Sequence, residues 1–181
     1  MTSENTSKLE RYVAILDSYL SGASPEDALR HCTEDYRLWF YKREGNGVTR
    51  DQVARLLEWD CALNPRHHYR DLSIGGKVLS AAFHEENDFS RLIDYPGWDA
   101  RVTFWFDDND LIKEQLYEPD QPELDYHAWL AAALPWLEVH HPDELADIYK
   151  DKRLVQSAES AAVWVDILGK WRKATGRPEL R

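Results

Sequence analysis

The sequence has few of the residues that define several common protein classes. Among 181 residues there are two cysteines, Cys32 and Cys61, and they form no Cys-x-x-Cys pair, so neither a disulfide framework nor a zinc module is expected. No apolar run approaches the ~18 residues of a membrane span, because the longest candidate, Trp129–Leu137, is short and contains Pro135. The polar segment Met1–Ser7 has neither the basic nor the apolar region of a secretory signal. We therefore expect a cytoplasmic protein without a membrane partner.

Basic residues are fewer than acidic ones. The chain has 22 Lys and Arg and 33 Asp and Glu, which gives a formal net charge of −11. A surface that repels phosphate is a poor match for nucleic acid or anionic lipid, so no nucleic-acid partner is expected. Hydrophobic residues make up 43% of the chain and aromatic residues 12%, including 8 Trp, which excludes a disordered chain. The length fits one domain with appended elements better than two separate domains.

Short motifs for cofactors and metals are missing. Gly45-Asn46-Gly47 lacks the Gly-Lys-Ser/Thr ending of a phosphate loop, and the sequence has no Gly-x-Ser-x-Gly turn. The tandem pairs His67-His68 and His140-His141 cannot readily chelate one metal, because neighbours on an extended strand point to opposite faces. Asp107-Asp108-Asn109-Asp110 lacks the central Gly and the downstream Glu of a calcium loop. We expect no metal and no cofactor.

The N-terminal part of the chain predicts three helices and one strand. Apolar residues recur at helical spacing over about Ser7–Ser21, which indicates an amphipathic helix. The segment Ser24–His31 begins with the Ser-Pro pattern of a capped, short second helix. The aromatic run Tyr36–Tyr41 is typical of a strand. Thr49-Arg50-Asp51-Gln52 has the spacing of a capping box and begins a third helix, which ends before Pro65.

Two predicted hairpins follow, each consisting of two strand-like runs around a turn rich in Gly or in Asp and Asn. Together with the first strand they give about five strands in one antiparallel set. The segment between the hairpins, Asn87–Ala100, contains Pro96-Gly97 and is predicted to be a polar connection. The four strand-like runs are Tyr69–Ile74, Lys77–Glu86, Arg101–Phe106 and Leu111–Tyr117.

From Pro122 onward the pattern becomes helical, with a break expected at Pro135 and a last helix capped by Ser157. Trp164 and Trp171 fall on one face of that last helix. Outward aromatic residues of a sheet need cover, and this helix face could supply it in the same chain or across a twofold axis. We therefore predict a homodimer.

The order of these elements resembles the nuclear transport factor 2-like superfamily, which has a cystatin-like α+β roll and includes the polyketide-cyclase-like proteins. The stretch Phe106–Asp120 looks like the family's strand, acidic turn, Ile-x-Glu motif and closing Asp, and Glu34-Asp35 is similar to its acidic pair before the first strand. The resemblance implies an α+β fold over residues 7–120, in which a bent antiparallel sheet wraps the N-terminal helices. Residues 121–181 would form a helical C-terminal extension that packs on the roll or on a partner subunit.

By analogy with this family, the concave side of the sheet holds an apolar pocket with a few polar groups. Period-two alternation places Val102, Phe104 and Phe106 on that side of one strand. On the next strand it places Gln115 and Tyr117 there, as polar groups aimed into an apolar surrounding.

Phe40 and Val102 argue against the chemistry of the ketosteroid isomerases in the same superfamily. Phe40 stands where the resemblance places the catalytic carboxylate, and Val102 stands where it places the oxyanion-hole acid. Neither side chain can exchange a proton or donate a hydrogen bond. Both are predicted to line the pocket instead.

His84 and Glu85 are neighbours on a predicted strand, so one should face the pocket and the other the outside. The sequence does not fix which. An inward His84 is a candidate general base, because imidazole titrates near neutral pH, and Tyr117 would then position a substrate oxygen. The alternative is that His84 is a strand-end residue near water.

The sequence therefore predicts a protein that binds an apolar or oxygenated small molecule, or a cofactor-independent enzyme of the lyase or isomerase type, similar to polyketide-cyclase-like proteins. The alternative is a non-catalytic interaction or accessory module, in which the pocket is filled core and the aromatic C-terminal helices are the working surface. His84 is the candidate catalytic residue, and the candidate binding residues are Phe40, Glu85, Val102, Phe104, Gln115 and Tyr117.

Overall fold

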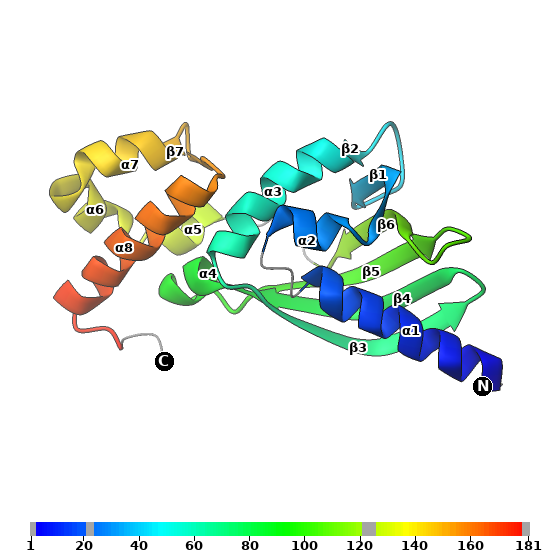
Figure 1. The fold of residues 1–181 in the computed structure, drawn as a ribbon. Coiled ribbons are helices and arrows are strands. Elements are labelled where there is room, and N and C mark those ends of the chain that lie inside the picture. Colours follow the sequence, from blue (N-terminus) through cyan, green and yellow to red (C-terminus); the bar gives the residue numbers. More distant parts are fainter. Residues whose placement is uncertain (1–2, 21–23, 121–125, 179–181) are drawn as a thin grey trace. The chain divides into compact units, whose positions relative to one another are not determined.

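The computed structural model describes residues 3–20, 24–120 and 126–178 (Figure 1). The chain divides into two compact units, each made of three segments. Unit 1 consists of Met1–Leu57, His67–Glu85 and Trp98–Pro122. Unit 2 consists of Glu58–Arg66, Glu86–Gly97 and Glu123–Arg181. Unit 1 carries most of the sheet together with the N-terminal helices and confirms the predicted α+β class, whereas unit 2 is mainly helical.

A six-stranded curved sheet and three helices account for most of the chain up to Pro119. The helices are α1 (Ser3–Leu20), α2 (Pro25–Leu29) and α3 (Arg50–Ala62). The strands are β1 (Cys32–Phe40), β2 (Val48–Thr49), β3 (Arg66–Gly75), β4 (Val78–Glu86), β5 (Trp98–Phe106) and β6 (Ile112–Pro119). They lie in the order β2-β1-β6-β5-β4-β3, which makes β3 an edge strand.

Most of the strand pairing is antiparallel, as predicted: β1 with β2, β4 with β5, and β5 with β6. One pair differs, because β1 runs parallel to β6. The expectation of a single antiparallel set is therefore wrong for this pair. Turn residues predict which neighbouring runs form a hairpin, but β1 and β6 are far apart in the sequence and no turn joins them.

The helices begin where the capping residues predict. Ser24 Oγ accepts a hydrogen bond from the Asp27 amide at 3.2 Å, and Pro25 occupies the first turn of α2. At the start of α3, Thr49 Oγ1 accepts from the Gln52 amide at 3.4 Å, and Gln52 Oε1 accepts from the Thr49 amide at 2.9 Å. Each bond satisfies a backbone donor that the helix itself cannot.

The core of unit 1 lies between the helices and one face of the sheet, which we call the inner face. Helix α1, drawn in blue in Figure 1, lies along this face and buries Tyr12, Leu16 and Tyr19. Every second residue of a strand points inward. The inward residues of the three central strands include Leu79, Ala81, Phe83, Val102, Phe104 and Gln115.

The edge strand β3 breaks its alternation once. Burial alternates regularly up to Tyr69, but Arg70 and Asp71 are both exposed, and Asp71 has a φ of 53°. An extra residue of this kind is typical of a β-bulge, and Asp tolerates the left-handed conformation better than most residues. As a result Tyr69 and Leu72, three residues apart, are both partly buried and packed against the core of unit 1.

Unit 2 is a small helical unit with its own core. Its remaining elements are α4 (Asp88–Leu92), α5 (Tyr126–Leu130), α6 (Leu134–His140), α7 (Pro142–Ile148), β7 (Tyr149–Lys150), β8 (Arg153–Leu154) and α8 (Ala158–Ala174). As predicted, the helical pattern breaks near Pro135, which lies in the first turn of α6, and Ser157 caps the last helix. Trp164 and Trp171 are 0% and 2% exposed, because both lie in this core. They do not form an exposed aromatic surface.

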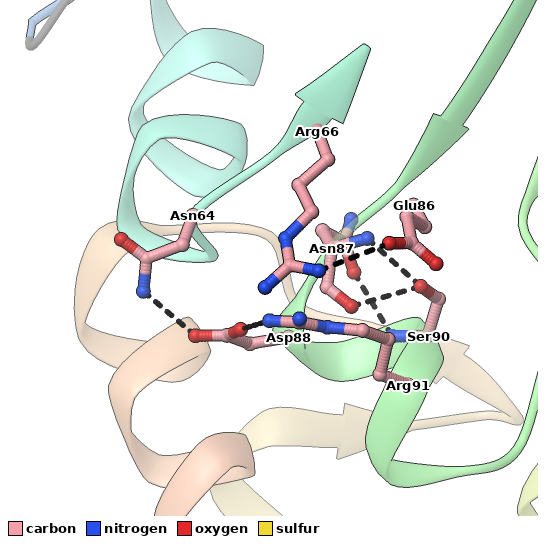
Figure 2. Close-up of polar contacts among 7 residues, drawn as sticks. All are labelled: Asn64, Arg66, Glu86, Asn87, Asp88, Ser90 and Arg91. Carbon is pink, nitrogen blue, oxygen red and sulfur yellow. Dashed lines mark hydrogen bonds and ion pairs between the residues drawn. The ribbon is translucent and has the colours of Figure 1, made fainter. Parts of the chain in front are cut away.

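Helix α4 replaces part of the polar connection predicted for Asn87–Ala100. A capping box starts it: Asn87 Oδ1 accepts from the Ser90 amide at 2.9 Å, and Ser90 Oγ accepts from the Asn87 amide at 2.9 Å (Figure 2). Asp88 accepts from Asn64 at 2.7 Å and pairs with Arg91. These contacts hold the start of α4 against Asn64, although Arg91 Nε has no hydrogen-bond partner among the described residues.

In the part of the chain that the structure describes, no helix is both long enough and apolar enough to span a bilayer.

Candidate functional site

A pocket of about 630 Å³ lies in unit 1 against the edge strand. Its walls come from α1, β3 and β4. The apolar part is formed by Val13 and Leu16 of α1 and Leu72 of β3. The break in alternation at Asp71 matters here, because it changes which residues after Tyr69 face the core.

The polar part of the pocket includes three histidines and a tyrosine. It consists of His67, His68, Tyr69 and Arg70 from β3, His84 from β4, and Asp17 from α1. Among the described residues, His, Cys, Asp and Glu nowhere gather in groups of three that could hold a metal ion. Two of the pocket histidines, His67 and His84, each pair with a carboxylate that is not part of the pocket lining.

The first pair lies on the inner face. His67 Nε2 and Glu85 Oε2 are 3.2 Å apart, and their side chains are only 12% and 20% exposed. The His67 ring also stacks on Phe83, with 5.5 Å between ring centres. Burial alternation along β4 puts Glu85 on the same face as Phe83 and Ala81. Of the two neighbours that the sequence could not separate, Glu85 is therefore the inward one.

The second pair lies on the opposite face. His84 Nδ1 is 3.0 Å from Asp99 Oδ1, and the two residues are direct partners of β4 and β5. The His68 ring lies beside that of His84, with 6.3 Å between centres. His84 does contribute to the pocket wall, but it is not the inward histidine that the general-base hypothesis required.

Tyr69, a residue of the pocket wall, carries a neutral hydroxyl group. Burial, reinforced by the nearby carboxylates of Glu85 and Asp17, raises the pKa of Tyr69 well above its ordinary value. Its Oη is inaccessible to water and makes no hydrogen bond with any residue the structure describes. An unpaired buried hydroxyl is costly and commonly marks the place of a water or ligand atom.

Gln115 is the other candidate residue with an unpaired buried group. Its Oε1 accepts hydrogen bonds from the hydroxyls of Tyr36 at 2.6 Å and Tyr19 at 3.3 Å. Its Nε2 has no partner among the described residues. Burial raises the pKa of both tyrosines well above the ordinary value, so both remain donors at neutral pH. Gln115 is inward, as the alternation predicted, but it lies in the core.

The remaining predicted binding residues lie together beside this core. Register pairs Phe104 with Gln115 and Val102 with Tyr117, and the Phe40 and Tyr117 rings are 5.8 Å apart. Val102 and Phe104 are 0% exposed, so these two positions are filled core, whereas Phe40 is 40% exposed. None of the predicted binding residues contributes to the pocket at the edge strand, and their role in binding stays a prediction.

Sequence reasoning missed the parts of the pocket that come from α1 and the start of β3. The spacing of His67 from Tyr69 places both side chains on one face of a strand, a signal that the tandem-histidine pattern by itself does not give. Asp17 carries a usable signal, because it lies four residues after Val13 and three before Leu20 on an amphipathic helix. No local pattern signals the break at Asp71, which the structure alone reveals.

Comparison with known proteins found no matching family model and no matching curated protein. Among solved structures, SalBIII, an epoxide hydrolase/cyclase-like enzyme of pyran ring formation in the polyether salinomycin, is 12% identical. The match has a TM-score of 0.50 and covers 62% of this chain and 92% of SalBIII.

Two further matches are uncharacterised proteins. One is a cystatin-like fold protein from Silicibacter pomeroyi DSS-3, with 14% identity, a TM-score of 0.48, and coverage of 74% of this chain and 89% of its own. The other is an NTF2-like protein from Cytophaga hutchinsonii ATCC 33406, with 9% identity, a TM-score of 0.43, and coverage of 60% and 89%. At these identities the similarity concerns the fold alone. The chain has the α+β class predicted from its sequence, and its fold is similar to that of SalBIII.

Proposed function

We propose that this protein binds a small molecule in the edge-strand pocket, and that the molecule has an apolar body and at least one hydrogen-bond-accepting oxygen. The observation that supports this is the pocket itself. Its volume of about 630 Å³ falls within the ~300–1,000 Å³ of typical small-molecule sites. Such sites combine an apolar wall with a few polar groups that fix the orientation of the ligand.

The apolar wall of Val13, Leu16 and Leu72 suits the body of the ligand. Donors dominate the polar part: Arg70 is always charged, and Tyr69 keeps its proton because burial raises its pKa. The Tyr69 hydroxyl itself is inaccessible to solvent, so Arg70 is the donor that a ligand oxygen can reach directly. These donors favour an oxygenated ligand over a pure hydrocarbon.

The alternative function, an interaction module that works through the aromatic C-terminal helices, has less support. Its two tryptophans, Trp164 and Trp171, are buried in the core of unit 2. Dimerisation stays a prediction.

Binding of 8-anilinonaphthalene-1-sulfonate tests the proposal, because this fluorescent probe combines an apolar ring system with sulfonate oxygens. Leu72→Trp places a bulky ring in the pocket and should weaken binding of the probe at least about tenfold, which corresponds to ~1.4 kcal/mol. Val139→Trp is the matched control, because Val139 is 72% exposed and lies in unit 2. Equal affinity of the two variants and the wild-type protein for the probe would contradict the proposal.

A further inference from the structure

We propose that Asn46 is a site of spontaneous deamidation, at which the chain converts a side-chain amide into an aspartyl or isoaspartyl residue. Asn46 lies in the link between β1 and β2 (Figure 1), and no residue of this link lines the edge-strand pocket. The inference therefore does not depend on the proposed binding function. Its consequence for the fold is a weaker pairing of β2 with β1.

The residue after Asn46 supplies the nucleophile. This residue is Gly47, and Asn46 is the only asparagine of the sequence that precedes a glycine. A side chain on the following residue hinders the approach of its backbone nitrogen to the asparagine Cγ, and glycine has no side chain. The two reacting groups belong to neighbouring residues, so the reaction needs no encounter of separate molecules.

The reaction needs water as its only co-reactant. The Gly47 nitrogen loses its proton and uses the electron pair to form a bond to Asn46 Cγ. The bond between Cγ and Nδ2 breaks, and Nδ2 takes up a proton and leaves as ammonia, so that a five-membered succinimide ring remains. Water then breaks one of the two bonds between the Gly47 nitrogen and a ring carbonyl carbon. Cleavage at Cγ gives aspartate, and cleavage at the main-chain carbonyl gives isoaspartate.

The local structure leaves both reacting groups free. Asn46 is exposed and lies in a turn. Among the described residues, none makes a hydrogen bond with the Asn46 side chain or with the Gly47 N–H. Gly45 has a φ of +68°, and a Cβ there would meet nothing within 4 Å, so the turn before Asn46 has room to rearrange. Rotation of the Asn46 side chain and of this turn brings Cγ to a nitrogen that stays in place.

The other asparagines of the chain each lack a requirement of the reaction. Asn64 precedes Pro65, whose nitrogen carries no hydrogen. Asn87 is 9% exposed, and its Oδ1 accepts a backbone N–H of α4 at 2.9 Å. Asn5 precedes a threonine and Asn109 precedes an aspartate, so a side chain stands beside the attacking nitrogen. Deamidation should therefore be confined to one position.

The isoaspartyl product changes a short and closely packed part of the sheet. β2 consists of Val48 and Thr49, and both pair with residues of β1. A Cβ at Gly47 would lie 2.7 Å from Cε2 of Trp39, which is 9% exposed, so the backbone already lies against this ring. Isoaspartate adds one carbon atom to the main chain directly before Gly47. The packing accepts that atom only if Gly47 and β2 move away from β1.

Incubation of the full chain at 37 °C and pH 8 tests the site. Trypsin cleaves after Arg43 and Arg50 and releases a peptide of residues 44–50, in which Asn46 is the only asparagine. We expect this peptide to gain one dalton and to separate into an aspartyl and an isoaspartyl form. Because an exposed turn opens at little cost in free energy, the rate should lie within about tenfold of the rate in guanidinium chloride. A peptide that keeps its mass in the folded chain and gains it in guanidinium chloride would overturn the proposal.

Two controls isolate the chemistry. Asn46→Gln keeps an amide, but its cyclisation requires a six-membered ring that forms much more slowly, so this variant should keep its mass. Asn109, which is exposed in a turn of the wild-type chain, should stay unmodified over the same period. Protein L-isoaspartyl methyltransferase should transfer a methyl group from S-adenosylmethionine to the aged wild-type chain and not to aged Asn46→Gln. Equal methylation of the two would place the reacting residue elsewhere and overturn the assignment.

Hydrogen exchange and urea denaturation test the consequence for the fold. In the aged wild-type chain the amides of β1 near Trp39 should exchange faster, and the urea midpoint should be lower, than in the fresh chain. Aged Asn46→Gln should match its own fresh sample in both measurements. A fully converted wild-type chain with an unchanged midpoint and unchanged exchange in β1 would overturn the weaker pairing of β2.

Discussion

Gln115 is the residue on which the buried polar groups of unit 1 converge. It is fully buried, yet it accepts hydrogen bonds from the hydroxyls of Tyr19 on α1 and Tyr36 on β1. Buried polar groups of this kind contribute little net stability when satisfied but are costly to leave unpaired. The amide therefore fixes how the helix and two strands meet more than it strengthens the core.

This asymmetry gives a first prediction. Gln115→Leu removes the acceptor that two buried hydroxyls share and should lower the free energy of unfolding by roughly 2–4 kcal/mol. Adding Tyr36→Phe to Gln115→Leu removes one of the unpaired groups, so the double variant should be less destabilised than the sum of the two single variants. Urea denaturation of all four proteins measures the difference. Additive losses would show that the hydroxyls do not depend on Gln115.

The same tyrosines predict how the protein responds to alkali. Burial raises the pKa of Tyr19, Tyr36 and Tyr69 well above 10.0 and that of the Cys32 thiol to about 12. In the unfolded chain these groups lose their protons first, so the unfolded state binds fewer protons and stability falls as pH rises. The loss begins near pH 9, the ordinary pKa of a thiol, and grows through pH 10 and above.

We therefore expect the buried tyrosines to ionise only as the protein unfolds. Tyrosinate absorbance at 295 nm and far-UV circular dichroism, followed together from pH 8 to 12, should change in one coincident transition after the exposed tyrosines have titrated. Complete ionisation while the dichroism is still native would contradict this account of the core.

At the scale of the element, the sequence predicts best where the signal is local. The cap at Ser24 and the capping box at Thr49 are read from four adjacent residues, and the structure confirms both helix starts. Helix α4 has a local signal too, in Asn87 and Ser90. Its five residues are too few for a helical period to appear, so the segment was predicted to be a connection.

Features that depend on distant segments could not be predicted in the same way. The parallel pairing of β1 with β6 joins residues such as Leu38 and Gln115, and no turn between them reveals its direction. The same contrast between local and long-range features applies to the candidate site. Alternation placed Gln115 and Val102 on the inner face, but the pocket depends on how α1 approaches the irregular edge strand β3.

The link between β1 and β2 provides a test at this scale. Gly47 has a φ of +63°, and a Cβ there would lie 2.7 Å from Trp39 Cε2. Gly47→Ala should therefore cost roughly 2–4 kcal/mol, from a strained backbone and from overpacking of a buried ring. Gly45→Ala is the matched control: its φ is +68° but nothing lies within 4 Å, so about 1 kcal/mol is expected.

Thermal and urea denaturation of these two alanine variants measure the contrast. Equal losses of stability in Gly45→Ala and Gly47→Ala would mean that the backbone conformation, and not the close approach of Trp39, is the reason that glycine is needed at position 47.

At the scale of the whole molecule, unit 2 is discontinuous in sequence, since it combines Glu58–Arg66 and Glu86–Gly97 with the C-terminal segment. Its core reflects this. The Phe89 ring packs edge-on against Trp164 with 5.4 Å between centres, and Trp59 packs against Phe89 at 5.8 Å. The C-terminal helices are therefore not an independent addition, because residues from the middle of the chain complete their core.

Helix α8 supplies polar contacts to this core as well as apolar ones. Arg172, 6% exposed, donates to the Leu92 carbonyl at 2.9 Å and to Asp94 Oδ1 at 2.7 Å. Truncation that removed α8 would thus leave a carbonyl and a carboxylate without this partner and would uncover apolar rings. An exposed apolar surface of that kind drives association in water.

Deletion of residues 157–181 should therefore cause self-association, because Phe89 loses the Trp164 ring that packs against it and the core of unit 2 loses the apolar residues of α8. Size-exclusion chromatography with light scattering measures this as a molar mass several-fold above that of the full-length chain. Trp164→Phe is the control within the same helix: it keeps an aromatic ring against Phe89 and removes an indole N–H that no described residue accepts. It should keep the full-length mass and lose roughly 1–2 kcal/mol of stability. A truncated chain with the mass of one chain and an unchanged thermal midpoint would show that the residues of the middle segments are covered without α8.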